Sequence, residues 1–180
     1  QMIGTPCEAA GTDAMTLNYG KCQKPGPEDM FNSRLIIIWG ANPAWTTPHQ
    51  MRYVFDAQEQ GAKIVVIDPL LTATAARSDL YYQIRPGTDG LLALGFAKVL
   101  LEKNLLDQQF LRYYTYGWPE YKDYLATVDL KRVSEDTAIP LVDIYELACL
   151  YGTTKPATIW LGIGIQRALT GGQNVRAIDS

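Results

Sequence analysis

The hydrophobic and polar positions of residues 33–180 follow two alternating patterns. Short, nearly continuous apolar runs are separated by longer segments in which apolar residues recur at helical spacing. The short runs are typical of buried strands, and the longer segments predict amphipathic helices. Because strands alternate with helices, the pattern predicts βαβ units and a parallel sheet. We therefore expect a doubly wound α/β fold, a Rossmann-like three-layer αβα arrangement with helices on both faces of a mainly parallel sheet.

The apolar runs predict four strands. In chain order they are LIIIW (35–39), AKIVVIDP (62–69), LYYQIRPG (80–87) and ATIWLGIGIQ (157–166). The second run is apolar on both faces, which is expected of a strand covered by helices on each side. Helices are predicted within residues 46–61, 90–104 and 139–156, with two short helices within 107–127. Thr88 and Asp89 are N-cap candidates for the helix within 90–104.

The first 32 residues have a different character. They are rich in Gly and Pro and contain one weak helix, so we expect residues 1–32 to form an entry segment that carries Cys7. Residues 33–180 form the predicted α/β domain. The chain ends at RAIDS, inside an expected helix, and we expect the whole to be a fragment of a larger protein.

Composition and charge exclude several classes of protein. The 180 residues are 47% hydrophobic and 19% charged, as in a soluble globular domain. The net charge of −3, without a Lys/Arg cluster, argues against nucleic-acid binding. The longest apolar run, residues 35–39, is too short to insert directly into a membrane, and no signal peptide opens the chain. Its three cysteines lack C-x-x-C spacing, which argues against a self-contained zinc or iron–sulfur site.

Three predicted strands end in small, turn-forming or acidic residues. In an open parallel sheet, ligands bind beyond the carboxyl ends of the strands. Asp68 lies where dinucleotide-binding folds place the carboxylate that accepts hydrogen bonds from a ribose. Each feature also has a simpler explanation: Gly40 and Gly87 as ordinary turn residues, Asn42 as an Asx turn, and Asp89 as a helix cap. Their occurrence on successive strands favours a nucleotide site.

Asp89 suggests which base is bound. A carboxylate accepts two hydrogen bonds side by side, and guanine offers a matching pair of donors in its ring N–H and its exocyclic amine. Adenine has no such pair. We therefore expect Asp89 to favour guanine.

Other chemistry is poorly supported. No G-x-G-x-x-G follows the first strand, and the chain has no G-x-x-x-x-G-K-S/T phosphate loop. The single histidine, His49, is expected to be a solvated surface residue. Cys7 lies just before helix-forming residues, where a thiolate is stabilised for reactivity or for binding a soft metal, although an unpaired cysteine is more often inert.

Four sequence blocks resemble one family, the molybdenum or tungsten bis-(molybdopterin guanine dinucleotide) oxidoreductases, also called the dimethyl sulfoxide reductase family. LIIIWGANPAWTTP resembles the family's W-G-x-N-P block, and GAKIVVIDPLLTATAARSD its G-A-K…D-P block. IRPGTDGLLALG resembles R-P-G-T-D-x-A-L, and GIGIQRALTGGQNVRAI the later G-x-G-x-Q-R…R-A-I segment. The blocks occur in order over nearly the whole chain.

The resemblance implies that the strand ends hold the guanosine and phosphates of one pterin cofactor. It implies that the cofactor-binding residues are Trp39, Gly40, Ala41, Asn42, Pro43, Ala44, Trp45, Thr46, Asp68, Pro69, Leu70, Leu71, Thr72, Gly87, Thr88, Asp89, Gly162 and Gln166. Leu70 departs from the family pattern, because many members carry Arg there.

The resemblance also gives Cys7 a role as the catalytic metal ligand, since the family's ligand lies a little over a dozen residues before a glycine like Gly20. A thiolate ligand is similar to that of formate dehydrogenases, periplasmic nitrate reductases or polysulfide reductases. The implied reaction is two-electron redox chemistry at Mo or W, with electrons passing through a 4Fe-4S cluster in a missing N-terminal region. The isolated chain is expected to be inactive.

The implied partners are the missing domains of its own chain, together with iron–sulfur electron-transfer and membrane-anchor subunits. The substrate, the choice between Mo and W, and the compartment, cytoplasm or periplasm, stay open. Two alternatives also stay open. One is a non-catalytic structural or electron-transfer module of the same fold that has lost the pterin. The other is the central domain of a thiamine-diphosphate enzyme, which does not account for the I-D-P and P-G-T-D blocks.

Overall fold

A computed structural model describes residues 7–22 and 24–180 of the protein. Within these residues one four-stranded sheet has the order β3-β2-β1-β4, and every neighbouring pair is parallel. The strands are β1 (Leu35–Trp39), β2 (Lys63–Ile67), β3 (Leu80–Tyr82) and β4 (Ala157–Leu161). The parallel sheet predicted from the apolar runs is confirmed.

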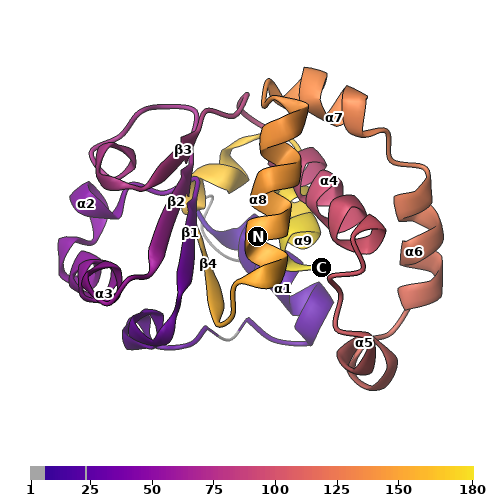
Figure 1. Ribbon diagram of the computed structural model, residues 1–180, viewed down its shortest axis with the longest axis horizontal. Coiled ribbons are helices and arrows are strands. Elements are labelled where there is room, and N and C mark those ends of the chain that lie inside the picture. Colours follow the sequence, from indigo (N-terminus) through magenta and orange to yellow (C-terminus); the bar gives the residue numbers. More distant parts are fainter. Residues whose placement is uncertain (1–6, 23) are drawn as a thin grey trace, which may run out of the picture.

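Helices cover both faces of the sheet, as Figure 1 shows. One face packs against α3 (Pro48–Glu59) and the 3-10 helix η1 (Pro27–Asn32), with α2 (Pro43–Thr46) beside α3. The other face packs against a layer that consists of α1 (Ala9–Tyr19), α4 (Asp89–Glu102), α7 (Leu130–Thr137), α8 (Leu141–Thr153) and α9 (Gly171–Asp179). The predicted three-layer arrangement is therefore confirmed.

The remaining elements are short. Helix α5 (Gln108–Tyr114) and helix α6 (Trp118–Ala126) lie beyond α4 in Figure 1, and they match the two short helices predicted within 107–127. Two more 3-10 helices, η2 (Ala75–Arg77) and η3 (Ile163–Arg167), follow β2 and β4. None of the helices in the described part of the chain has both the length and the apolar character that crossing a membrane requires.

The core explains why β1 is apolar throughout. Successive side chains of a strand point to opposite faces, and here Ile36 and Ile38 join the cluster beneath α3, whereas Leu35, Ile37 and Trp39 join the cluster beneath α4 and α8. All five residues of β1 are buried. Ala14 of α1 belongs to the second cluster, so this helix contributes to the same core as the sheet.

Three expectations about the elements are corrected. Strand β3 ends at Tyr82 rather than at Gly87, because the chain leaves the sheet and the N–H of Arg85 donates to the carbonyl of Thr137, at the end of α7. Strand β4 ends at Leu161 rather than at Gln166, and η3 follows it. Helix α7 was not predicted, because it is short and mostly polar.

The turn after β1 lies unusually close to the end of β4. Gly40 turns the chain with φ +63°, and the N–H of Gly162 donates to the carbonyl of Trp39 at 2.7 Å. A Cβ atom on Gly162 would collide with the carbonyl of Gly40. The N–H of Gly164 donates to that same carbonyl at 3.2 Å, and Ile165 is buried against the turn. These contacts fix η3 to the carboxyl end of β1.

We predict that Gly162→Ala lowers the stability of the fold. The added Cβ must push the Gly40 carbonyl away, and overpacking of this kind typically costs about 1–3 kcal/mol. Urea unfolding followed by circular dichroism measures the loss. Gly172→Ala is the matched control, because Gly172 lies in α9 and a Cβ there meets nothing closer than 3.4 Å. Equal stability of the two variants would contradict the close approach.

Candidate functional site at the carboxyl edge of the sheet

The predicted strand-end segments meet at one edge of the sheet. Trp39, the last residue of β1, is in register with Ile67 of β2 on one side and with Leu161 of β4 on the other. The segments that leave these three strands therefore begin side by side. The fourth predicted segment, which ends at Asp89, reaches the same edge through a hydrogen bond from the Trp39 indole.

Trp39 and Asp89 form a buried polar pair. The Nε1–H of Trp39 donates to Oδ1 of Asp89 at 2.8 Å, and the two residues are 2% and 5% exposed. The indole also packs against Phe96 of α4, with the ring centroids 6.1 Å apart. Trp39 therefore holds both the first residue and the middle of α4. Its burial leaves the indole directed at protein atoms rather than at the surface.

The start of α4 is also held from α9. The N–H of Gly90 donates to Oδ1 of Asn174 at 3.2 Å, and Nδ2 of Asn174 donates to the carbonyl of Gly87 at 3.5 Å. Asn174 is 4% exposed, so its side-chain amide forms these hydrogen bonds inside the protein. Thr88 occupies the N-cap position, but its hydroxyl donates to the carbonyl of Arg85 and makes no capping bond. The N-cap position predicted for Thr88 is therefore confirmed, although its side chain makes no capping bond, and the prediction for Asp89 is wrong because Asp89 is the first helical residue and bonds Trp39.

Asp68 shapes the turn after β2. Its Oδ1 accepts a hydrogen bond from the N–H of Leu70 at 2.9 Å, and its backbone carbonyl accepts one from the hydroxyl of Tyr81 at 3.1 Å. Gln83 donates to the carbonyl of Pro69 at 2.9 Å. The segment from Asp68 to Thr72 is therefore held to β3 and the residues after it.

The two carboxyl groups at this edge share an electrostatic environment. Burial raises the pKa of Asp68, and the N–H of Leu70 opposes this rise. Burial also raises the pKa of Asp89, the hydrogen bond from Trp39 opposes it, and the nearby charge of Asp68 adds to it. The charged forms of both groups are thus disfavoured by the protein, so a ligand that brings N–H or O–H donors stabilises them.

Thr74 is a positioning residue that the sequence did not single out. Its hydroxyl donates to Oδ1 of Asn42 at 2.7 Å and accepts from the N–H of Ala44 at 3.1 Å, and the residue is 2% exposed. It joins the segment after β2 to the segment after β1. The side chain of Asn42 thus bonds to Thr74, instead of the Asx turn considered from the sequence. The local sequence TATAA carries no motif that would have marked this contact.

The other predicted residues divide by exposure. Pro43 and Gly162 are buried like the two acids and Trp39, and they support the edge from within. Several segments expose side chains or backbone that a ligand can reach. The exposed residues are Trp45, Thr46, Leu70 and Leu71, and the partly exposed ones are Gly40, Ala41, Asn42, Ala44, Pro69, Thr72, Gly87, Thr88 and Gln166.

Cys7 lies beside η3. It is exposed and is separated from α1 by Glu8, and its Sγ accepts a hydrogen bond from Nη2 of Arg167 at 3.1 Å. Gln166, the preceding residue of η3, accepts a hydrogen bond from the N–H of Gly11 at 2.8 Å. The structure therefore brings the predicted metal ligand to the segment that follows β4. Arg167 was part of a recognised sequence block but was not itself predicted as a site residue.

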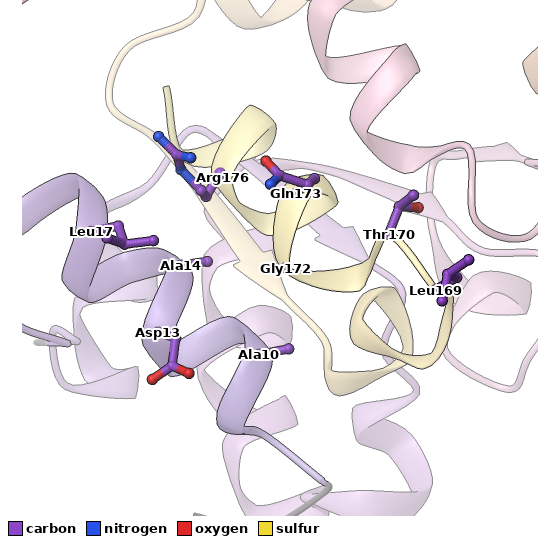
Figure 2. A pocket seen from close by; sticks show the side chains of 9 residues that line it. All are labelled: Ala10, Asp13, Ala14, Leu17, Leu169, Thr170, Gly172, Gln173 and Arg176. Atoms are coloured by element: carbon purple, nitrogen blue, oxygen red, sulfur yellow. The ribbon is translucent and has the colours of Figure 1, made fainter.

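Two surface hollows lie away from the predicted residues. Figure 2 shows the first, about 280 Å³ in volume, where Ala14 and Leu17 of α1 face Gln173 and Arg176 of α9. The second, about 580 Å³, is lined by α4, α6 and α9. Gly87 is the one predicted site residue that lines either of them.

Comparison with known proteins establishes the family. A family model described as molybdopterin oxidoreductase matches residues 4–180. A probable oxidoreductase of Bacillus subtilis (strain 168), YoaE, is 38% identical over 178 residues, which are 99% of this chain and 26% of that protein. The dimethyl sulfoxide reductase DmsA of Escherichia coli (strain K12) is 35% identical over 190 residues, covering 91% of this chain and 23% of that protein. The chain belongs to the molybdopterin oxidoreductase family.

A solved structure agrees with the fold. Acetylene hydratase from Pelobacter acetylenicus superposes with a TM-score of 0.84 over 96% of this chain and 23% of its own, at 24% identity. The chain spans about a quarter of the length of the relatives it matches. Membership of the family implies a molybdopterin cofactor that carries molybdenum or tungsten.

We predict that Trp39→Phe destabilises the protein and changes its response to pH. The variant keeps a ring in the core but removes the indole donor of the Asp89 carboxylate, and loss of such a bond typically costs about 1–3 kcal/mol. The pKa of Asp89 already lies above its ordinary value of 3.8, so the contribution of Asp89 to stability is greatest below that pH and falls as the pH rises through the folded-state pKa. Without the indole donor the pKa rises further, and the fall extends to higher pH.

Urea unfolding at a series of pH values measures both effects. Trp160→Phe is the matched control, because Trp160 lies on the adjacent strand β4 and its indole makes no hydrogen bond to another described residue. A pH profile for Trp39→Phe that is identical in shape to that of the wild type would contradict the assignment.

Proposed function

We propose that this chain is the nucleotide-binding part of a full-length molybdopterin oxidoreductase, and that it holds one molybdopterin guanine dinucleotide of a bis-cofactor. The observation that carries the proposal is the meeting of three strand ends and the start of α4 around the buried acids Asp68 and Asp89. Parallel sheets of this type bind nucleotides at the carboxyl ends of their strands.

The residues of this edge fit the guanosine end of such a cofactor. Asp68 follows β2, where an accepting carboxylate suits the hydroxyl groups of a ribose. Asp89 uses one oxygen for Trp39 and retains acceptor capacity for the N–H donors of a guanine. The small, partly exposed Ala41 leaves room for the backbone to approach phosphates. Because the acids are partly desolvated, donors from the nucleotide would compensate their charge.

Cys7 is the proposed protein ligand to the metal. It lies beside Arg167, and the exposed Sγ is accessible to a group bound outside this chain's core. When bound, the metal centre supplies two-electron redox chemistry. We propose that its electrons pass through a 4Fe-4S cluster outside this chain, and that other domains of the same protein complete the site. The isolated chain would accordingly be inactive.

A non-catalytic module of the same fold is the alternative. Such a module has no use for a metal-binding thiol together with an acid that retains acceptor capacity for a nucleotide. Cys7 retains a cationic neighbour in Arg167, and Asp89 retains a dedicated donor in Trp39. The presence of both arrangements favours the cofactor-binding proposal.

We predict that Cys7→Ser changes the metal centre of the intact protein. Replacing sulfur by oxygen alters the ligand field, so the electron paramagnetic resonance spectrum should shift and turnover should fall sharply. Cys22→Ser is the matched control, because Cys22 is a partly buried free thiol that follows α1. An unchanged spectrum for Cys7→Ser, at full metal content, would return Cys7 to a structural role.

We predict that Asp89→Asn removes the preference for guanine. The amide keeps an oxygen for the Trp39 donor but places an N–H₂ group opposite the donors of guanine. A charge-assisted hydrogen bond is typically worth about 1.5–3 kcal/mol, so GDP should bind about 10-fold more weakly or worse.

Calorimetric titration of the cofactor-free intact protein with GDP, and with ADP as the comparison ligand, measures this change. Asp123→Asn, at an exposed position of α6, is the control for loss of charge alone. Equal binding of GDP and ADP by the wild type would mean that Asp89 serves only to hold Trp39 and α4.

A further inference from the structure

The helix that follows Cys7 lacks a cap of its own. The first N–H groups of any α-helix have no partner within the helix, and a side chain at the N-cap position usually bonds one of them. In α1 the N-cap residue is Glu8, and its side chain makes no capping hydrogen bond. The first bond within the helix runs from the N–H of Thr12 to the carbonyl of Glu8. The N–H of Gly11 therefore needs a partner from elsewhere.

Gln166 supplies that partner from the far end of the chain. Its Oε1 accepts a hydrogen bond from the N–H of Gly11 at 2.8 Å. The contact depends on the absence of a side chain, because a Cβ atom on the buried Gly11 would overlap the Gln166 amide. The backbone of Gln166 is packed just as closely, since a Cβ on Gly171 would collide with its carbonyl. Gln166 is thus packed against Gly11 through its side chain and against Gly171 through its backbone.

Gln166 is rigidly connected to the edge of the sheet. Gly162 and Gly164 donate to the carbonyls of Trp39 and Gly40, and Ile165 is 2% exposed against that turn. Arg167, the next residue, donates to Sγ of Cys7. Two consecutive residues of η3 therefore contact the start of α1 and the thiol that precedes it. No other described residue hydrogen-bonds the N–H of Gly11.

We propose that Gln166 is a positioning residue for Cys7 rather than a direct contact of the cofactor. Its side-chain oxygen caps α1. The cap fixes the position of Cys7, which precedes the helix, relative to the carboxyl edge of the sheet. Its effect on a bound metal is transmitted through Gly11 and α1. This inference rests on the proposed function only where it concerns the metal, because the capping contact itself is a property of the chain.

Two substitutions of similar length separate this role from a cofactor contact. Gln166→Glu keeps an oxygen acceptor for Gly11 but removes the amide donor. Gln166→Met keeps the length and removes the acceptor. If Gln166 caps α1, Glu can replace it and Met cannot. If Gln166 donates a hydrogen bond to the cofactor, neither Glu nor Met can replace it. Gln173→Met is the matched control, because Gln173 is an exposed glutamine of α9 on the side facing α1.

The first readout is amide hydrogen exchange of the first turn of α1, followed by mass spectrometry in the intact protein without its cofactor. Loss of one net hydrogen bond corresponds to about 10-fold faster exchange at Gly11. We expect this in Gln166→Met, and wild-type exchange in Gln166→Glu and Gln173→Met. Gly11→Ala provides a second route to the same break, because its Cβ displaces the amide while Gln166 is retained. Wild-type protection in both Gln166→Met and Gly11→Ala would overturn the capping role.

The second readout is the electron paramagnetic resonance spectrum of the metal-loaded protein. We expect Gln166→Met to broaden or shift the spectrum and Gln166→Glu to preserve it. Equal disturbance by Glu and Met would show a donor contact to the cofactor and would overturn the proposal. Failure of the proposed function is recognised separately, because the spectrum of Cys7→Ser would then equal that of the wild type. That result would overturn the link to the metal, while Gly11 exchange would still decide the capping role.

Discussion

The carbonyl of Gly40 is approached by the backbone of residues 162–164 so closely that no room is left for a side chain. Gly162 lies against it without a Cβ, and Gly164 donates to it. This close packing forces β1 and β4 to end at the same level and directs η3 across the turn. The positions of Ile165, Gln166 and Arg167 follow from it, and so does the distance between the sheet edge and Cys7. A local steric requirement at one peptide thus determines the geometry of residues from both ends of the chain.

At the carboxyl edge of the sheet, the buried side chains that orient their neighbours differ from the exposed groups that a ligand can touch. Trp39 lies in the family block that first indicated a nucleotide site, yet it is 2% exposed and bonds Asp89. Thr74 is equally buried and orients Asn42. Because these side chains are fixed by packing, the exposed backbone and side chains that they support are held in one arrangement before a ligand arrives. Preorganisation of this kind reduces the entropy lost on binding.

Local sequence patterns were sufficient for the layers of the fold and for the meeting of the strand ends at one edge of the sheet. The continuous apolar runs of β1 and β2 indicate that both faces of these strands are buried. In a parallel sheet the carboxyl ends of neighbouring strands lie at the same edge, independently of the helices that connect them. The patterns could not show which side chains bond across the edge. The pairs Trp39–Asp89, Gly11–Gln166 and Cys7–Arg167 join residues far apart in sequence, and no periodicity encodes them. Strand β3 was predicted too long because the N–H of Arg85, beyond its end, donates to the carbonyl of the distant residue Thr137.

The strand order also sets the sequence in which the protein assembles on the ribosome. Strand β1 lies inside the sheet, and its neighbour β4 is synthesised long after it, whereas its other neighbour β2 follows it closely. At typical synthesis rates of about 5–20 residues per second, one edge of β1 stays without its partner on the order of ten seconds. During that time a fully apolar strand has an open hydrogen-bonding edge, which invites pairing with other chains. Until residue 161 has left the exit tunnel, this open edge of β1 exposes the nascent chain to aggregation, and a slow synthesis rate prolongs that exposure.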